Sequence, residues 1–199
     1  MKLVLIRHGQ TQWNEQRRTQ GHRDSPLTET GLRQADHLGQ ALRTLTPRDF
    51  FCSDTGRALQ TAERIARANP GFPPVRPEPR LRELDFGAWE GLTHEEIRSQ
   101  YPDLYRIYRS DPAGFRAPDG ETFRDVQRRF LSFAEDLEPE SGGTVVAVTH
   151  SGTIRLALLA LTGRPLAEVW SLPFVAETSV SILGWERGAW KVESAAAVW

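Results

Sequence analysis

The sequence predicts an α/β fold: a three-layer α/β/α sandwich built on a largely parallel sheet. Short apolar runs recur along the chain and alternate with longer segments whose apolar residues have helical spacing. Strands that alternate with helices are typical of parallel sheets covered by helices on both faces. The stretch from about residue 84 to 123 is rich in Tyr, Trp, Arg and Pro and interrupts this alternation. We expect it to form a small, mostly helical insertion over the edge of the sheet, above the active site, within one domain spanning residues 1–199.

Three apolar runs, at residues 3–6, 50–52 and 145–149, are short enough to form buried strands. A terminal hairpin is expected from the runs at 180–185 and 190–193, which flank a Glu-Arg-Gly-Ala turn. Helices are expected wherever apolar residues recur every three or four positions. These segments are 28–45, 58–66, 123–137 and 151–161.

The predicted ends of the helices depend on polar residues. Ser53 or Asp54 is expected to cap the second helix. Thr93 begins a capping-box pattern that Glu96 completes, which predicts a short helix inside the insertion. The Pro-rich stretch 69–79 is expected to be a connector without regular structure.

Composition excludes several classes of protein. The chain has 199 residues, of which 39% are hydrophobic and 26% charged, enough for one globular domain with a full core. Its single cysteine, Cys52, rules out an internal disulfide framework and fits a reducing compartment. The apolar start is too short for a signal peptide or a membrane span, so a cytoplasmic location without membrane contact is expected. A net charge of −1 argues against nucleic-acid binding.

Two histidines stand directly after predicted strands. His8 follows the first strand through Arg7, and His150 follows the strand at 145–149. In open α/β sheets, ligands bind beyond the carboxyl ends of the strands, where both imidazoles would meet. Arg57 lies in the first turn of the helix after the second strand and would point to the same crevice. Because helix N-termini near Asp54 and Ser151 add backbone N–H donors, the crevice is predicted to bind an anion.

Each of these residues alone has an ordinary structural explanation. A histidine after a strand is more often a structural hydrogen-bonding group than a nucleophile. An arginine in a first helical turn is usually a solvated surface residue, although the helix dipole disfavours it there. Glu83 could simply pair with a neighbouring arginine. Only their joint occurrence favours a functional site.

In their order and spacing, these residues resemble the histidine phosphatase superfamily, also called phosphoglycerate mutase-like, and especially its small broad-specificity and alpha-ribazole phosphatases. The resemblance covers nearly the whole chain, and its one departure is Gln10, where the family usually has Glu. The matching segments are Leu5-Ile6-Arg7-His8-Gly9, Thr11, Asn14, Gln20-Gly21-His22, Ser25-Pro26-Leu27-Thr28, Gly31, Ser53, Arg57-Ala58-Leu59-Gln60-Thr61-Ala62, Glu83 to Gly91, Asp119-Gly120-Glu121 and His150-Ser151-Gly152 with Arg155.

The resemblance implies a phosphomonoesterase and gives each residue a role. His8 would attack phosphorus and form a phosphohistidine, with its other ring nitrogen held by a backbone carbonyl. Arg7, Arg57 and a protonated His150 would clamp the phosphoryl oxygens. Glu83 would protonate the leaving oxygen and then assist water.

The same resemblance implies further substrate-binding groups and a partner. Asn14, Gln20, Gly21 and Ser151 match positions that contact the phosphoryl group. No cofactor and no metal is expected, because the arginines neutralise the charge that a cation balances elsewhere. The partner is a small phosphomonoester, and a homodimer is left open. Glu90 is a second candidate acid, although we expect it to be a surface carboxylate beside Trp89.

Other chemistries fit the sequence poorly. A cysteine-dependent tyrosine phosphatase needs one residue more than the four that separate Cys52 from Arg57. A phosphodiesterase with two His-x-Ser/Thr motifs is a poor fit, because the residue two positions after His8, like the residue two positions after His150, carries no hydroxyl group. No His-Glu-x-x-His sequence indicates a zinc hydrolase.

Two alternatives remain, and the substrate is left undetermined. A phosphoglycerate mutase would return the phosphoryl group to a substrate, but such mutases typically have a longer insertion that closes over the site. A non-catalytic phosphate-binding or scaffold protein is disfavoured by the presence of His8, Glu83 and His150 together. Five arginines of the insertion could contact a second anionic group, although most are expected to be solvated: Arg98, Arg106, Arg109, Arg116 and Arg124.

Overall fold

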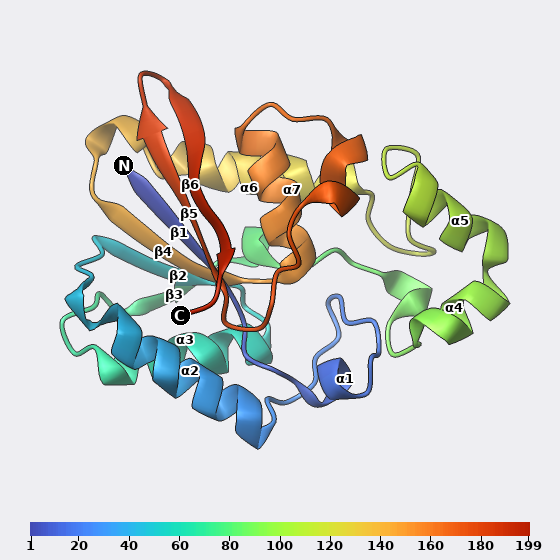
Figure 1. Cartoon of the computed structure of the whole chain (residues 1–199), viewed down its shortest axis with the longest axis horizontal. Helices are drawn as coiled ribbons and strands as arrows, with labels where there is room; N and C mark the ends of the chain where they lie inside the picture. The colour runs from blue at the N-terminus through green and yellow to red at the C-terminus, as the bar shows by residue number, and fades with distance from the viewer.

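A computed structural model describes all of residues 1–199 and shows a six-stranded sheet in the order β3-β2-β4-β1-β5-β6 (Figure 1). The strands β3, β2, β4 and β1 are parallel, whereas β5 runs antiparallel to β1 and β6 antiparallel to β5. The predicted largely parallel sheet is therefore confirmed. The strand bounds are Lys2–Arg7 for β1, Asp49–Cys52 for β2, Val75–Pro77 for β3, Thr144–Thr149 for β4, Val180–Glu186 for β5 and Ala189–Ala197 for β6.

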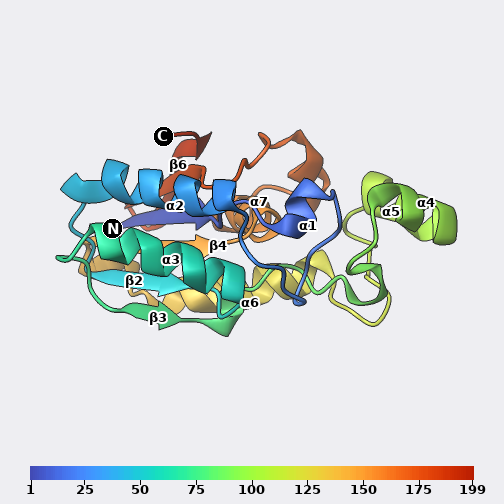
Figure 2. The same cartoon turned by 90° about the horizontal axis from the view of Figure 1, so that it is seen from below.

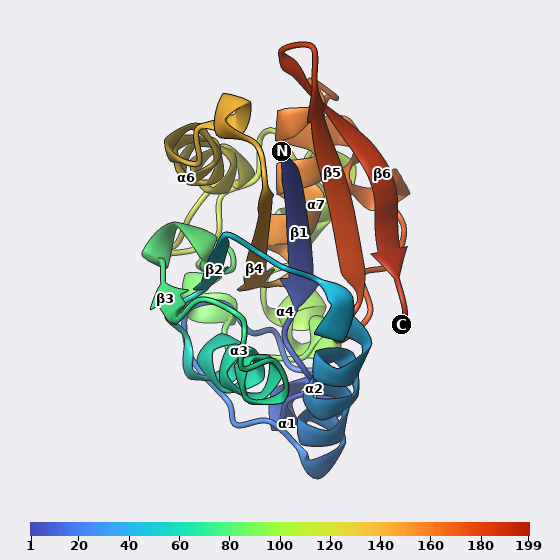
Figure 3. The same ribbon diagram turned by 90° about the vertical axis from the view of Figure 1, so that its left-hand side faces the viewer.

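Helices cover both faces of this sheet. Figure 3 shows α2 and α3 on one side and α6 and α7 on the other, which confirms the three-layer sandwich. No helix is long and apolar enough to cross a membrane. The helix bounds are Gln12–Glu15 for α1, Glu29–Ala41 for α2, Gly56–Ala68 for α3, His94–Gln100 for α4, Pro102–Ser110 for α5, Phe123–Asp136 for α6 and Ser151–Leu161 for α7.

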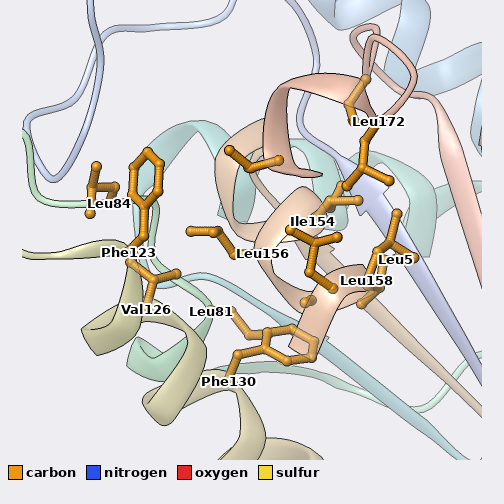
Figure 4. Packing of buried hydrophobic residues seen from close by; sticks show 14 of the residues in the cluster. Leu5, Leu81, Leu84, Phe123, Val126, Phe130, Ile154, Leu156, Leu158 and Leu172 are labelled. Carbon is orange, nitrogen blue, oxygen red and sulfur yellow. The ribbon is translucent and has the colours of Figure 1, made fainter. Parts of the chain in front are cut away.

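Alternate residues of the central strands supply the two halves of the core. In β1, Leu3 and Leu5 pack with the residues of α6 and α7, whereas Val4 and Ile6 pack with those of α2 and α3. Figure 4 shows Leu5 among apolar side chains of the α6 and α7 side. A strand covered on both faces needs apolar residues at every position, which explains the continuous apolar run.

The insertion is part of the main core. Trp89 is buried, and its ring lies 5.5 Å from that of Tyr108, which in turn lies 4.9 Å from Phe115. These rings belong to the same apolar cluster as α6 and α7. Figures 1 and 2 show α4 and α5 together at one end of the molecule, beyond the carboxyl ends of β1 and β4. The insertion thus follows the strand ends rather than covering the edge of the sheet.

Two local predictions are wrong. The Pro-rich connector contains β3, which pairs with β2 at the edge of the sheet, where a proline is tolerated. The N-cap of α3 is Thr55, because Asp54 instead forms hydrogen bonds of 2.7 and 2.5 Å with the Arg82 guanidinium. The Thr93–Glu96 capping box at the start of α4 is confirmed.

Candidate active site

His8 and His150 lie side by side because their strands are neighbours. β1 and β4 are parallel, and Arg7 is in register with Thr149, so the residue after each strand reaches the same place. The two imidazole centroids are 5.1 Å apart, with the rings tilted by 60°. Both side chains are buried, His150 completely. The pair therefore lies together at the carboxyl ends of β1 and β4.

The His8 ring is held with one nitrogen engaged. Its Nδ1 lies 2.8 Å from the carbonyl oxygen of Gly9, so Nδ1 donates and Nε2 carries the free lone pair. Burial, followed by the positive charges of Arg57 and Arg7, holds the pKa of His8 well below its usual range. The ring is thus neutral at neutral pH, the state that a nucleophile requires.

Arg57 is held by the loop before α2. Its Nη1 donates to the Arg23 carbonyl at 3.1 Å and to Asp24 Oδ1 at 2.9 Å, and its Nη2 donates to the Gly21 carbonyl at 2.6 Å. The side chain is fully buried, yet its Nε has no hydrogen-bond partner. Two of its three nitrogens therefore fix the guanidinium and the third is available.

Arg7 is fixed in the same way by a different loop. Its Nη1 donates to the Val175 carbonyl at 2.7 Å, and its Nη2 lies 2.9 Å from a carboxylate oxygen of Glu177. Its Nε is buried without a partner. Sequence reasoning missed Val175 and Glu177, since nothing in their local sequence marks them as partners of Arg7.

Four buried nitrogens of the predicted site have no partner within the protein. They are Arg7 Nε, Gln20 Nε2, Arg57 Nε and His150 Nδ1. A buried polar group without a hydrogen bond costs about 1–3 kcal/mol. Native structures rarely leave several such groups unpaired, so these nitrogens indicate a place for an anion with several acceptor oxygens.

The protonation state of His150 differs from the prediction. Burial, followed by the charges of Arg57, His8, Arg129 and Arg7, holds the pKa of His150 well below its usual range. The protein by itself therefore keeps this imidazole neutral at neutral pH. A bound dianion would supply the opposite charge that favours the protonated ring.

Glu83 lies at the N-terminus of α7. Its Oε1 accepts from the N–H groups of Leu84, at 3.0 Å, and Thr153, at 2.9 Å, and from the Thr153 hydroxyl at 3.2 Å. Its Oε2 accepts one bond, from the Gly152 N–H at 2.8 Å. Oε1 is thus saturated and Oε2 keeps a lone pair for a proton. The alternative that Glu83 pairs with a neighbouring arginine is not observed.

The remaining predicted binding residues lie around the loop that follows β1. Asn14 Oδ1 accepts from the N–H and hydroxyl of Thr11, which completes the capping box of α1. Gln20 Oε1 lies 2.9 Å from the same hydroxyl, whose single hydrogen it shares with Asn14 Oδ1, and the Gln20 amide nitrogen has no partner. Gly21 contributes its carbonyl to Arg57, and Ser151 begins α7.

Two further groups near the predicted site are not available to a ligand or for catalysis. The N–H of Gly9 donates to the Thr61 hydroxyl, so it is not free for a ligand. Cys52 is fully buried, and burial raises the pKa of its thiol to about 12. A thiol that does not ionise is no nucleophile, which removes the cysteine-phosphatase alternative.

Glu90 is buried, so the prediction of a surface carboxylate is wrong. Its Oε1 accepts from the N–H groups of His22, at 2.7 Å, and Phe86, at 3.2 Å, and its Oε2 accepts from the Arg23 N–H at 2.7 Å. It thereby fixes the loop whose carbonyls hold Arg57. Gly21 lies against this carboxylate: a Cβ there would come within 2.1 Å of Glu90 Oε1.

The family comparison agrees with this geometry. The model of the histidine phosphatase superfamily (branch 1) matches residues 3–197. The chain belongs to this superfamily. The structure shows that five side chains converge at the carboxyl end of the sheet, but their roles in the reaction remain predictions. These residues are His8, Arg7, Arg57, Glu83 and His150.

Relatives and solved structures of this superfamily cover most of the chain. A "Probable phosphoglycerate mutase GpmB" of Yersinia pestis (strain Pestoides F) is 36% identical over 166 residues, 83% of this chain and 76% of the relative. Bacillus stearothermophilus YhfR is 37% identical, with a TM-score of 0.92 over 99% of this chain and 97% of that one.

Two phosphatases are also similar in structure. The mycobacterial glucosyl-3-phosphoglycerate phosphatase, in complex with VO3, is 32% identical with a TM-score of 0.87 over 96% of each chain. The alpha-ribazole phosphatase from Shigella flexneri is 28% identical with a TM-score of 0.87 over 99% of this chain and 96% of that one. Together with the family match, these neighbours support a phosphoric monoester hydrolase.

Proposed function

We propose that the protein hydrolyses a small phosphorylated metabolite through a phosphohistidine intermediate on His8. The observation that carries the proposal is the pairing of a neutral His8, whose Nδ1 is engaged, with unpartnered nitrogens on Arg7, Arg57 and His150. A nucleophile with a free lone pair thus lies among donors that suit the oxygens of a phosphoryl group.

The proposed reaction has two steps. His8 Nε2 attacks phosphorus in line with the leaving oxygen, the P–O bond breaks, and the proton of Glu83 passes to that oxygen. Glu83 then takes a proton from water, which attacks the phosphohistidine and releases inorganic phosphate and neutral His8. Arg7 and Arg57 balance the charge on the phosphoryl oxygens throughout.

His150 gains its charge on substrate binding in this mechanism. The neighbouring arginines and burial keep the ring neutral before binding. A phosphate dianion beside Nδ1 reverses that balance, so the imidazole takes up a proton and donates it in a hydrogen bond. Substrate binding should therefore be accompanied by proton uptake.

Phosphoglycerate mutase activity is the second candidate function. It is favoured by the 36% identity to the probable mutase of Yersinia pestis. The short insertion argues against mutase activity, because its two α-helices, α4 and α5, have seven and nine residues. A mutase must keep water from the phosphohistidine, whereas a phosphatase must admit it.

The deciding experiment measures two reactions of the purified protein in the presence of excess EDTA. A phosphatase releases inorganic phosphate from p-nitrophenyl phosphate and from metabolite phosphates under these conditions. A mutase converts 3-phosphoglycerate to 2-phosphoglycerate, with 2,3-bisphosphoglycerate as the phosphoryl donor. Isomerisation faster than phosphate release would overturn the phosphatase proposal, and loss of activity in EDTA would overturn its metal independence.

The clamp is tested by Arg57→Lys. Lysine keeps the positive charge but lacks the planar set of donors that contacts Gly21, Arg23 and an anion together. We expect turnover to fall by about two orders of magnitude, as on removal of one transition-state donor. Arg67→Lys, an exposed change on the same helix, is the matched control. Similar kinetics in the two variants would remove Arg57 from the site.

Glu90→Gln tests how Arg57 is positioned. The amide replaces one acceptor oxygen by a donor that faces backbone N–H groups, so the loop at residues 21–23 loses at least one bond. We expect a stability loss of about 1–3 kcal/mol and, because the carbonyls that hold Arg57 shift, a roughly tenfold fall in kcat with little change in KM. Thermal unfolding and steady-state kinetics are measured against the exposed Glu95→Gln. Lower stability with unchanged kcat would mean that Glu90 is merely structural.

A further inference from the structure

A cavity of about 160 Å³ lies next to the phosphate site. Glu83, Ser151 and Gly152 form the wall that it shares with that site. Glu83 is the proposed proton donor to the leaving oxygen, so whatever is attached to that oxygen extends from Glu83 into this cavity. The other walls are mostly apolar or aromatic; Figure 4 shows three of them, Leu84, Phe123 and Leu156.

The aromatic walls define the size and shape of the group that fits. Tyr108 and Trp170 have ring centroids 4.7 Å apart in an edge-to-face arrangement, and Phe86 and Phe123 lie 6.3 and 5.9 Å from Tyr108. An apolar cavity of about 150 Å³ holds one benzene molecule. The cavity therefore accommodates one six-membered ring, with aromatic edges and faces to contact it.

Two arginines lie near the Trp170 ring: Arg155, which lines the cavity, and Arg109, which is exposed beside it. The guanidinium carbons of Arg109 and Arg155 lie 4.7 and 6.0 Å from the Trp170 ring. Arg155 donates to the Pro173 carbonyl at 3.3 Å, and its Nε is buried without a partner. Neither arginine forms an ion pair with a carboxylate, unlike most arginines that line the rest of the site.

Electrostatics agrees with this geometry. Burial, the largest cause, lowers the pKa of Arg155; Tyr108 and Glu83 raise it in part, and the nearby charge of Arg109 lowers it. The unpartnered Nε of Arg155, with a second cation nearby, favours a bound anion at this end of the cavity. Arg109 belongs to the insertion arginines that the sequence suggested for a second anionic group, whereas Arg155 was not among them.

We propose that this cavity binds the leaving group and that the substrate is an aryl phosphomonoester with one ring and a carboxylate substituent. The ring lies against the cavity-facing sides of Tyr108, Phe123 and Trp170, and the carboxylate lies at Arg155, with the positive charge of Arg109 nearby. The inference rests on the proposed phosphatase function and names its substrate class. Hydrolysis cleaves the P–O bond, the phenolic oxygen receives the proton of Glu83, and water completes the phosphate.

The test compares two esters that differ in charge alone at the far end of the ring: 4-(carboxymethyl)phenyl phosphate and its neutral analogue 4-(carbamoylmethyl)phenyl phosphate. The methylene group separates the substituent from the phenol, so the two leaving groups are of similar quality. We expect kcat/KM to favour the carboxylate about tenfold, as for one charged hydrogen bond in a partly buried site. Phenyl phosphate and glycerol 3-phosphate complete the series, and the phenyl ester should be the better of these two.

Two variants assign the preference to the arginines. Arg155→Gln and Arg109→Gln should each reduce the carboxylate-to-amide ratio to below about threefold. Arg106→Gln, an exposed residue on the same helix as Arg109 that pairs with Asp103, should keep the ratio of the unchanged protein. Because the readout is a ratio within one variant, a general loss of folding or turnover does not imitate the expected result.

The outcomes separate this inference from the proposed function. Equal kcat/KM for the two esters, or a preference that survives in both arginine variants, overturns the substrate class while phosphatase activity stands. No His8-dependent release of phosphate from any ester overturns the proposed function, and the substrate class with it. A larger kcat/KM for glycerol 3-phosphate than for phenyl phosphate shows that the cavity does not bind an aromatic ring.

Discussion

His8→Ala is expected to abolish the covalent intermediate and to reduce turnover by more than roughly four orders of magnitude, as on loss of any sole nucleophile. The Nε2 lone pair of His8 lies among the positive charges of Arg7 and Arg57 and beside His150, whereas burial keeps the Cys52 thiol protonated. Brief reaction with a radiolabelled phosphomonoester, followed by quenching, should leave an acid-labile, alkali-stable phosphoryl group on the protein. Peptide mapping should locate it on His8.

The matched control is His37→Ala, which removes an exposed imidazole from α2. That variant should label and turn over like the unchanged protein. Thermal unfolding of His8→Ala checks that the fold persists, because its ring occupies a buried place beside His150. A label on Cys52, a serine or another histidine would show that the proposed mechanism is wrong.

The central strands could be predicted because each encodes its own environment. The runs at 3–6 and 145–148 are apolar at every position, and the structure shows both of them buried on both faces. β3 could not be found this way, since Val75–Pro77 lies at the edge of the sheet, where apolar and polar residues are equally tolerated. Its existence depends on pairing with β2, a contact that no local pattern records.

The same distinction separates the site residues that were found from those that were missed. His8, Arg57 and His150 stand at the ends of predicted strands or the starts of helices, so topology alone brings them together. Glu90 and Glu177 act through contacts with distant segments: one binds the loop at residues 22–23, and the other pairs with Arg7. A buried carboxylate between Trp89 and Gly91 has no sequence signal that distinguishes it from an exposed one.

Glu83→Gln should slow the phosphorylation of His8 much more with an alkyl phosphate than with p-nitrophenyl phosphate. An alkoxide is a poor leaving group and needs a proton, whereas p-nitrophenolate leaves readily without one. General acid catalysis contributes roughly 10²–10⁴-fold, so we expect a loss of that size with glycerol 3-phosphate and less than about tenfold with p-nitrophenyl phosphate. Single-turnover rates across pH isolate this step from the later attack by water.

Glu90→Gln is the comparison that makes the result specific to acid catalysis. Glu90 acts on the loop around Arg57 and not on the leaving oxygen, so its loss should slow both substrates by the same factor. Glu83 differs because its Oε2 accepts a single bond, from Gly152, and because its side chain lines the cavity proposed for the leaving group. If Glu83→Gln slows the two substrates equally, Glu83 serves to position the start of α7; if Glu90→Gln instead slows the alkyl phosphate selectively, Glu90 is the acid.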